Sequence, residues 1–183
     1  MAEGDTIRRI ADKVLARLVG QRCVGTTTRD PRLVGTDFTG RTLVSADAVG
    51  KHLFLRFDDG RSLHAHLLMT GNIVVGPAAP VAPSRRRIEI DFEPGRFTGV
   101  DVPLLDVIQT ADEPSLIGHL GPDLCGPNPP DIVEITRRLA HDPAVPLAEA
   151  MLDQRNVAGF GNVYAVEVPF IVGISPLQPA GTI

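Results

Sequence analysis

Apolar residues recur every three or four positions near the start of the chain, while charged residues occupy the positions between them. This spacing predicts an amphipathic helix with one buried face. Asp5 or Thr6 is expected to cap its start, and Gly20 is expected to end it. The apolar stripe consists of Ile7, Ile10, Ala11, Val14, Leu15 and Leu18.

Short segments rich in apolar and β-branched residues follow, as is typical of strands. In one of them apolar and acidic residues alternate, which predicts a buried face and a wet face that carries Glu89, Asp91 and Glu93. Turn residues such as Asp58-Asp59-Gly60 and Pro94-Gly95 separate the segments. The pattern predicts an antiparallel β-sandwich or barrel. The expected strands are 42–48, 51–57, 62–69, 88–93 and 102–108.

Helical patterns return in the last third of the chain, after a Gly/Pro-rich stretch at 121–130 that predicts a linker. Pro169 lies inside the last expected helix and should kink or shorten it, because proline has no backbone N–H. We therefore expect an α+β protein with domains at 1–120 and 121–183. The expected helices are 131–141, 147–152 and one that begins near Asn162, and 76–84 is expected to be an exposed loop.

Composition changes this picture only in part. A net charge of −4 argues against a nucleic-acid partner, although a local basic stripe can coexist with an acidic remainder. No apolar run reaches the roughly 20 residues that span a bilayer. The N-terminus is acidic where a signal peptide would be basic. We therefore expect a cytoplasmic protein.

Cysteines and histidines do not suggest a metal site. Cys23 and Cys125 lie far apart in the sequence, and we expect both to be small buried thiols. His64 and His66 share one face of an expected strand, but no third ligand is evident nearby. We therefore expect no metal in this chain.

The N-terminus offers a nucleophile. Removal of Met1 leaves Ala2 with a free α-amine, whose ordinary pKa of about 8 lies well below the value of about 10.4 for lysine. Such an amine can form a Schiff base with a sugar carbon, and Glu3 can carry the protons. The alternative is a solvated tail before a helix, which is the commoner case for an arbitrary protein.

Two other segments carry candidate chemistry. Lys51 lies at the entry to a strand, where it can place its charge on a phosphate or a leaving group, or can be an ordinary exposed turn lysine. In 152–165 two glycines permit a tight turn, and a helix then begins at Asn162. Its backbone N–H groups and amide favour a phosphate, although an ordinary helix cap also accounts for Gly161 and Asn162.

Four motifs in order resemble the signatures of the formamidopyrimidine/endonuclease VIII family of DNA glycosylases. They are Ala2-Glu3-Gly4-Asp5-Thr6, Gly50-Lys51-His52-Leu53, His66-Leu67-Leu68-Met69-Thr70-Gly71 and the run from Leu152 to Ala165. Each motif alone is weak, but four in register are specific. The resemblance extends from residue 2 to about residue 181, and the first motif favours the endonuclease VIII-like branch.

The resemblance implies a catalytic β-sandwich domain followed by a helix–two-turn–helix domain, in a monomer that binds duplex DNA. Such enzymes extrude a damaged nucleotide, cut its glycosidic bond and nick the strand. By position, Ala2 is the expected nucleophile, Glu3 the proton donor and acceptor, and Lys51 the contact to sugar or phosphate.

The same resemblance assigns three residues to DNA binding. Asn162 is expected to hold a phosphate beside the lesion, and Arg155 matches a position that is usually basic and directed at DNA. Met69 falls where the family places a side chain that fills the gap left by the extruded base. A buried strand methionine is the alternative.

Three departures from the family pattern alter these expectations. The usual nucleophile is proline, and the imine of Ala2 withdraws electrons only while protonated, so we expect slower lyase chemistry. The sequence stops at Ile183, without the family's zinc finger, so we expect no zinc here and weaker DNA binding. Arg96-Phe97 fits the family's arginine–phenylalanine wedge only loosely and is not assigned to it.

Two functions from other classes remain open at this stage. Loss of the proline and the finger would suit a module that only recognises damaged DNA, although Glu3 and Lys51 favour an enzyme. Helix–two-turn–helix elements also occur in RNA-binding proteins, but the N-terminal half argues against that function.

Overall fold

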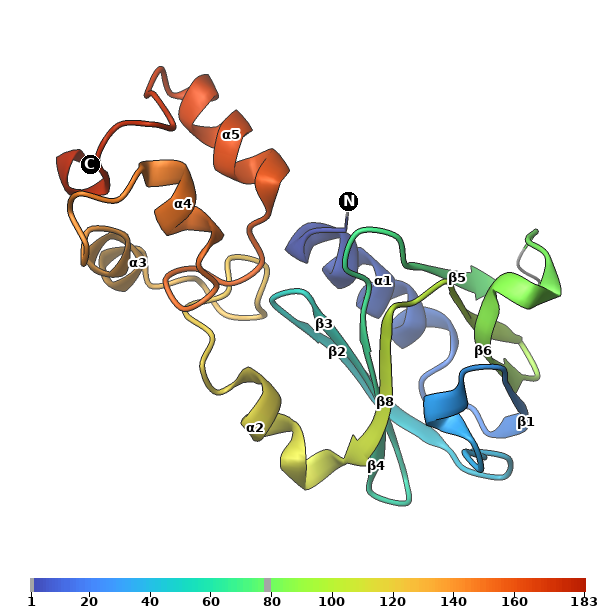
Figure 1. Cartoon of the computed structure of the whole chain (residues 1–183). Helices are drawn as coiled ribbons and strands as arrows, with labels where there is room; N and C mark the ends of the chain where they lie inside the picture. The colour runs from blue at the N-terminus through green and yellow to red at the C-terminus, as the bar shows by residue number, and fades with distance from the viewer. Residues whose placement is uncertain (1, 78–79) are drawn as a thin grey trace. The chain divides into compact units, whose positions relative to one another are not determined.

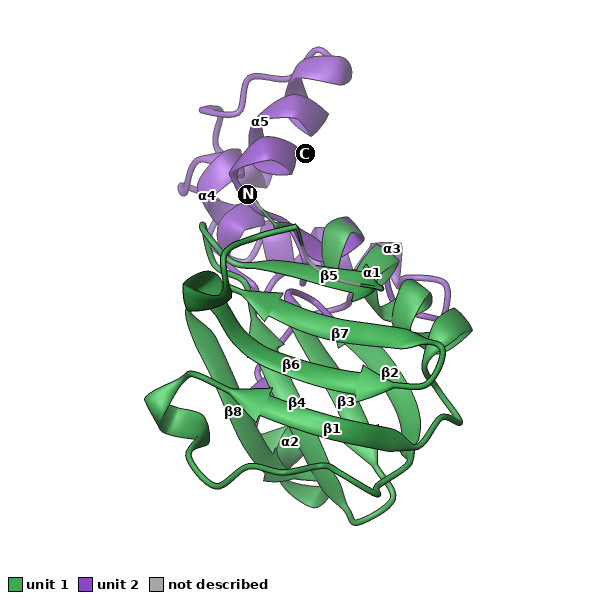
Figure 2. Ribbon diagram, turned by 90° about the vertical axis from the view of Figure 1, so that its right-hand side faces the viewer, with its two compact units in different colours: residues 1–2, 6–48, 52–115 green, residues 3–5, 49–51, 116–183 purple. Residues whose placement is uncertain are grey.

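The computed structural model describes residues 2–77 and 80–183 (Figure 1). The chain forms two compact units, drawn in different colours in Figure 2. Unit 1 contains Ala2 and residues 6–48 and 52–115, and unit 2 contains residues 3–5, 49–51 and 116–183. The start of the chain at 3–5 and the short segment 49–51 thus belong to unit 2. The expected domain bounds of 1–120 and 121–183 stay a prediction.

The first helix, α1 (Gly4–Arg17), forms as its apolar spacing predicts. Leu15 is an exception in the stripe, because it is 41% exposed while the other members are buried. The expected caps are also wrong, because Asp5 and Thr6 lie inside the first turn. Gly20 follows the helix with φ of 82°, as expected for a helix stop.

Unit 1 is an antiparallel β-sandwich, as expected. One sheet has the strand order β1-β6-β7-β5 and the other β2-β3-β4-β8, and Figure 2 shows the first sheet in front of the second. The inner faces and the apolar side of α1 share one core. The strands are β1 (Cys23–Thr28), β2 (Leu43–Val49), β3 (His52–Phe57), β4 (Arg61–His66), β5 (Asn72–Gly76), β6 (Arg86–Phe92), β7 (Gly95–Val100) and β8 (Leu104–Gln109).

The first sheet was largely missed by the sequence patterns, which predicted only β6. Strands β1, β5 and β7 are five or six residues long and carry glycines, so their local signal is weak. They become strands by pairing: β1 and β7 flank β6, and β5 pairs with β7. The expected strand 62–69 ends earlier, at His66.

The expectation that Glu89 lies on a wet face of β6 is wrong, because Glu89 is only 5% exposed. Its carboxylate accepts hydrogen bonds from Arg29 at 2.9 Å, Arg86 at 3.0 Å and Arg96 at 2.8 Å. Burial alone would raise the pKa of Glu89, but these contacts outweigh it and hold the pKa below its usual range. A buried carboxylate needs such partners.

Unit 2 is helical, with α3 (Ile132–Leu139), α4 (Leu147–Leu152) and α5 (Asn162–Ile171) where helices were expected. Asp131 caps α3 by accepting a hydrogen bond from Glu134 N at 2.9 Å. α5 continues through Pro169 for two more residues, so the proline falls in its last turn. A small core joins α4 and α5 through Leu147, Met151 and Ala165.

A short helix, α2 (Glu113–Ile117), was not predicted. The described residues also form four 3-10 turns: η1 (Pro31–Leu33), η2 (Pro83–Arg85), η3 (Thr110–Asp112) and η4 (Ala180–Thr182). In the expected exposed loop 76–84, Gly76 is instead the last residue of β5, whereas Pro77, Pro80 and residues 82–84 are exposed as expected, and residues 78–79 lie outside the described residues. No helix in the described ranges has the length and apolar character needed to cross a membrane.

Candidate active site

A buried carboxylate lies at the start of α5. Glu3 is 3% exposed. Its Oε2 accepts a hydrogen bond from Gly161 N and its Oε1 from Val163 N, both at 2.9 Å. These amides have no partner within the helix, and the positive end of the helix dipole favours a negative charge. Glu3 therefore caps α5 from a point 160 residues away in the sequence.

Two glycines permit this arrangement. A Cβ at Gly161 would lie 2.7 Å from the carboxyl carbon of Glu3, so a larger residue would push the carboxylate away. A Cβ at Gly4 would lie 2.8 Å from Gly159 Cα, and Gly4 N donates a hydrogen bond to Gly159 O at 2.9 Å. The close approach of these backbones fixes the position of Glu3.

Lys51 belongs to the turn between β2 and β3. Asp123 accepts hydrogen bonds from Gly50 N at 2.7 Å and from Cys125 N at 2.8 Å, one on each carboxylate oxygen. Asp123 also forms a backbone bridge with Ala158. One aspartate thus ties the lysine turn to the 122–126 segment and to the turn that precedes α5.

Lys51 is half-buried, and its charge interacts with that of Glu3. Burial lowers the pKa of the ammonium group, and the negative charge of Glu3 offsets only part of the effect. A larger fraction of neutral lysine is therefore present than in water. Ala2, the expected nucleophile, directly precedes Glu3 and packs partly against the core of unit 1.

Asn162 is the first residue of α5, and its side chain is exposed. Within the described residues, its amide has no hydrogen-bond partner. The expectation that the first backbone N–H groups of this helix face a phosphate is wrong for Gly161 and Val163, because both donate to Glu3.

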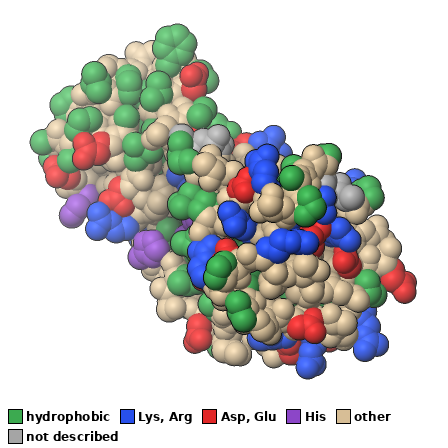
Figure 3. All heavy atoms as spheres, turned by 45° about the vertical axis from the view of Figure 1, so that its right-hand side comes forward, with side chains coloured by type: hydrophobic (Ala, Val, Ile, Leu, Met, Phe, Trp, Pro, Cys, Tyr) green, Lys and Arg blue, Asp and Glu red, His purple; other side chains and the backbone are tan. Residues whose placement is uncertain are grey.

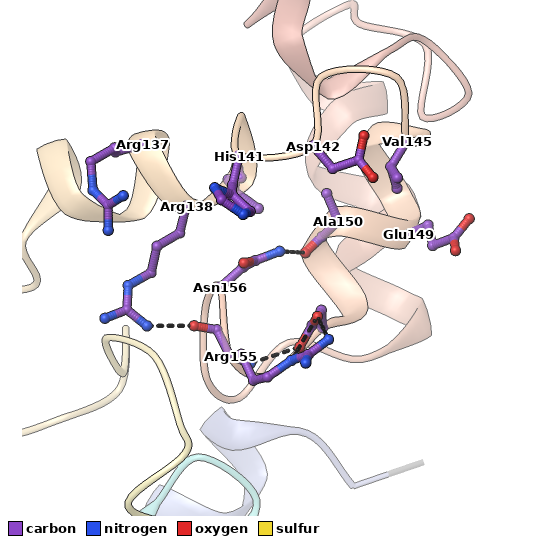
Figure 4. A pocket seen from close by; sticks show the side chains of 11 residues that line it. Arg137, Arg138, His141, Asp142, Val145, Glu149, Ala150, Arg155 and Asn156 are labelled. Carbon is purple, nitrogen blue, oxygen red and sulfur yellow. Dashed lines mark hydrogen bonds and ion pairs between the residues drawn. The ribbon is translucent and has the colours of Figure 1, made fainter.

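Arg155 lies in the turn between α4 and α5, with its side chain 73% exposed. It forms a forked pair with Asp153, with contacts of 2.9, 3.0 and 2.6 Å. The hydrogen bonds from Arg155 lower the pKa of Asp153. The Arg155 carbonyl accepts a hydrogen bond from Arg138 at 2.7 Å (Figure 4).

Arg155 also lines a pocket of about 650 Å³ between α3 and α4 (Figure 4). Arg137, Arg138 and His141 contribute to one side, and acidic residues such as Glu149 to another. The lining thus carries both signs of charge.

Met69 lies in the turn after β4 and is 65% exposed. The alternative of a buried strand methionine is therefore wrong. The turn is closed by a hydrogen bond from Gly71 N to Leu67 O at 2.8 Å. Leu68 adopts φ of 45°, which is uncommon for a residue with a side chain.

A family model, the formamidopyrimidine-DNA glycosylase N-terminal domain, matches residues 1–103. The chain belongs to the formamidopyrimidine/endonuclease VIII family of DNA glycosylases. It is 38% identical over 190 residues to probable endonuclease 8 2 of Streptomyces coelicolor, covering 99% of this chain and 67% of that protein. It is 39% identical over 183 residues to the DNA-(apurinic or apyrimidinic site) lyase Nei2 of Mycolicibacterium smegmatis, covering 100% of this chain and 71% of that protein.

The fold of this glycosylase family member also matches a solved structure. The formamidopyrimidine DNA glycosylase of Lactococcus lactis, bound non-covalently to DNA with an abasic site, superposes with a TM-score of 0.82 at 22% identity. The match covers 99% of this chain and 72% of that chain. The expected fold class and the resemblance to the family are thus confirmed.

Arg96 and Phe97 do not form a wedge in this glycosylase. Phe97 is fully buried in the sandwich. Arg96 forms ion pairs with Glu89, at 2.8 Å, and with Asp91. Both side chains therefore stabilise the first sheet.

Three histidines of the glycosylase cluster on β3 and β4: His52 and His64 stack, and the His66 ring lies edge-on to His52. His64 is buried, its Nε2 lies 2.9 Å from His52 Nδ1, and its own Nδ1 has no hydrogen-bond partner within the described residues. His66 Nδ1 accepts a hydrogen bond from Leu68 N at 3.2 Å. In the part of the chain that the structure describes, no group of three or more His, Cys, Asp or Glu side chains could hold a metal.

The two cysteines differ in burial. Cys23 is buried, and burial raises the pKa of its thiol, whereas Cys125 is only half-buried. The expectation of two buried thiols is therefore wrong for Cys125.

Asp123 contributes to the candidate site of this family member, but the sequence patterns did not predict that role. It follows Gly121-Pro122 in a stretch that predicts a linker, and aspartate in such a stretch is typical of turns. Its local role fits that pattern, because it accepts from Cys125 N. Its contact with Gly50, 73 residues away, has no sequence signal.

Proposed function

We propose that this glycosylase excises oxidised bases from duplex DNA and nicks the strand at the resulting abasic site. The observation that carries the proposal is the buried Glu3 carboxylate, held at the start of α5 beside a partly desolvated Lys51 and directly after Ala2. The names of the relatives, an endonuclease 8 and an abasic-site lyase, support the same reaction class.

In the proposed reaction, the Ala2 amine freed by removal of Met1 attacks C1′ of the deoxyribose. The N–C1′ bond forms as the glycosidic bond breaks, and the base leaves with the bonding electrons and takes up a proton. Glu3 accepts the proton that the amine loses and donates one to the ring oxygen as the sugar opens to a Schiff base. Glu3, now a carboxylate again, then accepts a C2′ proton, and the electrons of that C–H bond form the C2′–C3′ double bond as the 3′ phosphate leaves with the electrons of the C3′–O bond.

Lys51 assists by its charge and its position. Its ammonium form stabilises the negative charge that develops on the phosphate or the leaving base. Because burial lowers the pKa of Lys51, this assistance declines at a lower pH than that of an exposed lysine. The chemistry needs only an amine, a carboxylate and a lysine.

The proposed DNA contacts lie on both units. Asn162 and Arg155 bind phosphates near the lesion, and the exposed Met69 fills the space left by the extruded nucleotide. Chromosomal DNA inside the cell is the proposed partner, and the glycosylase acts on it as a monomer.

Borohydride trapping tests the reaction. A duplex with one abasic site, incubated with the protein and sodium borohydride, is expected to give a covalent adduct whose tryptic peptide carries the sugar on Ala2. Acetylation of the α-amine should abolish it. Absence of an adduct, under conditions that trap a proline-bearing relative, would contradict the proposal.

Ala2 itself favours a second candidate, a module that recognises damaged DNA without cutting it. An alanine imine is a weaker electron sink than the iminium of proline. This candidate predicts tight binding to abasic DNA with neither an adduct nor a nick. The trapping experiment and a binding titration on the same duplex therefore separate the two functions.

A further inference from the structure

A second cleft, of about 800 Å³, opens in unit 1 next to the Met69 turn. Thr70, the residue after Met69, lines it, together with three arginines and two aspartates. The charged residues are Arg32, Arg85, Arg87, Asp30 and Asp101. Figure 3 shows several Lys and Arg side chains gathered on the surface of unit 1.

Two of the arginines are paired within the cleft. Arg32 forms a fork with the buried Asp30, with contacts of 2.9 and 2.6 Å, and also donates to Pro103 O at 2.7 Å. These hydrogen bonds lower the pKa of Asp30, so its charge persists at neutral pH. Arg85 donates from Nε to Asp101 at 2.6 Å.

The third arginine, Arg87, has no hydrogen-bond or ion-pair partner for its side chain among residues 2–77 and 80–183. Three guanidinium groups against two carboxylates leave one positive charge in the cleft. A guanidinium carries five N–H donors, and Arg85 uses only Nε for Asp101. Donors of Arg85 and Arg87 therefore remain for an anion with several acceptor oxygens.

Asp101, which lines the cleft, adopts a sparsely populated backbone conformation, and so does Leu68, two residues before Thr70. Within the described ranges, Leu68 and Asp101 alone among the non-glycine residues have positive φ, 45° and 46°. Asp101 N also donates to Arg85 O at 2.8 Å, so the two residues are tied by both backbone and side chain. Such backbone conformations cluster at binding and active sites.

We propose that this cleft binds a backbone phosphate of the DNA strand into which Met69 inserts. A phosphodiester carries one negative charge and accepts forked hydrogen bonds from arginine, which matches the one uncompensated charge and the Thr70 hydroxyl. The inference rests on the proposed function, because that function brings duplex DNA to Met69. It adds a phosphate contact on unit 1, separate from those of Asn162 and Arg155.

The test is a binding titration of an abasic-site duplex at several KCl concentrations, with fluorescence anisotropy as the readout. Each phosphate neutralised contributes a slope of about 0.9 to the dependence of log Kd on log salt. Arg87→Gln is expected to reduce the slope by about 1 and to weaken binding about three- to tenfold at 100 mM salt. Arg17→Gln, at an exposed arginine outside the cleft that also has no side-chain partner within the described residues, should change neither quantity.

A second arm locates the phosphate. Neutral methylphosphonates are placed one at a time along each strand. One position near the abasic site should weaken wild-type binding as much as Arg87→Gln does, and it should have no further effect on that variant. The proposal would be overturned if every methylphosphonate weakened the binding of Arg87→Gln as much as it weakens the binding of wild type. An unchanged salt slope for Arg87→Gln would also overturn it.

Failure of the cleft proposal is distinct from failure of the proposed function. If no borohydride adduct forms but Arg87→Gln reduces the salt slope as expected, the catalytic proposal is contradicted and the phosphate site is supported. If an adduct forms but Arg87→Gln has the wild-type salt slope, the phosphate site is contradicted and the catalytic proposal is supported. Failure of the wild-type protein to bind the duplex at 50 mM salt would overturn the phosphate site directly.

Discussion

Glu3 in unit 2 and Glu89 in unit 1 are both almost fully buried, at 3% and 5% exposure, but their surroundings differ. Neutral backbone amides at a helix start hold Glu3. Three arginines hold Glu89, as Arg56 holds the buried Glu113 in the same unit. The same residue type is thus buried in two chemically different ways.

The difference separates a reactive carboxylate from a structural one. Protonation of Glu89 must weaken three ion pairs, so its charge is part of the fold. Protonation of Glu3 breaks no contact with an arginine among the described residues, and the charge of Lys51 interacts with that of Glu3. A carboxylate held by neutral dipoles next to a nucleophile suits proton transfer.

Substitution of Glu3 provides the largest expected effect. Glu3→Gln should reduce the single-turnover lyase rate on abasic DNA by about 10²–10⁴-fold, because proton transfer is lost. The free energy of unfolding should fall by about 1–3 kcal/mol with the fold intact, because the amide oxygen accepts only one of the two hydrogen bonds. Glu167→Gln, at an exposed position of α5, is the matched control and should retain full activity. A Glu3→Gln variant as active as wild type would remove the distinction between the two glutamates.

Displacement of the Glu3 carboxylate without loss of its charge should have the next largest effect. In Gly161→Ala the new methyl group would lie 2.7 Å from the carboxyl carbon, so the carboxylate must move. A shift of about 1 Å can cost about 100-fold in rate. Gly76→Ala is the control, because a Cβ there meets no atom within 4 Å. Lyase rates of both variants, with a crystal structure of Gly161→Ala, check the prediction.

Substitution of Glu89 is expected to reduce stability and not activity, unlike substitution of Glu3. Glu89→Gln should leave the lyase rate unchanged but lower the free energy of unfolding by about 2 kcal/mol at pH 7, because charged hydrogen bonds are lost. The lowered pKa of Glu89 means that its contribution is present above the unfolded-state pKa of about 4.3 and is lost as the pH falls further.

Urea unfolding at pH 7 and pH 3 measures this difference. The gap between wild type and Glu89→Gln should narrow at pH 3, while Glu93→Gln, in an exposed turn, should match wild type at both values. A gap that is constant with pH would show that the arginines do not act through the charge of Glu89.

The contrast also explains what the sequence could predict. The helical stripe of α1, the strands of the second sheet and the helices of unit 2 follow from local periodicity, and the four motifs predict the family. The burial of Glu89 does not follow, because alternation on β6 predicts a wet face. Arg86 of the same strand covers the carboxylate together with Arg29 and Arg96 from outside the strand. Strands β1 and β5 were missed because their pairing partners lie far away in the sequence, and β7 was missed although β6 directly precedes it, because its two glycines weaken the strand signal.

The candidate site shows the same limit. Motif positions predicted Glu3 and Lys51 as functional residues, but not that Glu3 would occupy the amides expected to face a phosphate. That contact joins residues about 160 positions apart. Asp123, in a segment that looks like a linker, was missed altogether.

Asp123 provides the smallest expected effect and tests how the lysine turn is held. Both of its oxygens accept backbone hydrogen bonds, so Asp123→Asn can keep only one of them, and the Gly50 turn should loosen. We expect about a tenfold lower lyase rate, with an unchanged KM for abasic DNA, because Lys51 is mispositioned. Asp58→Asn, in the exposed turn after β3, is the control. Asp123→Asn should have no further effect in a Lys51→Gln background, and fully additive losses would mean that Asp123 acts on the site by another route.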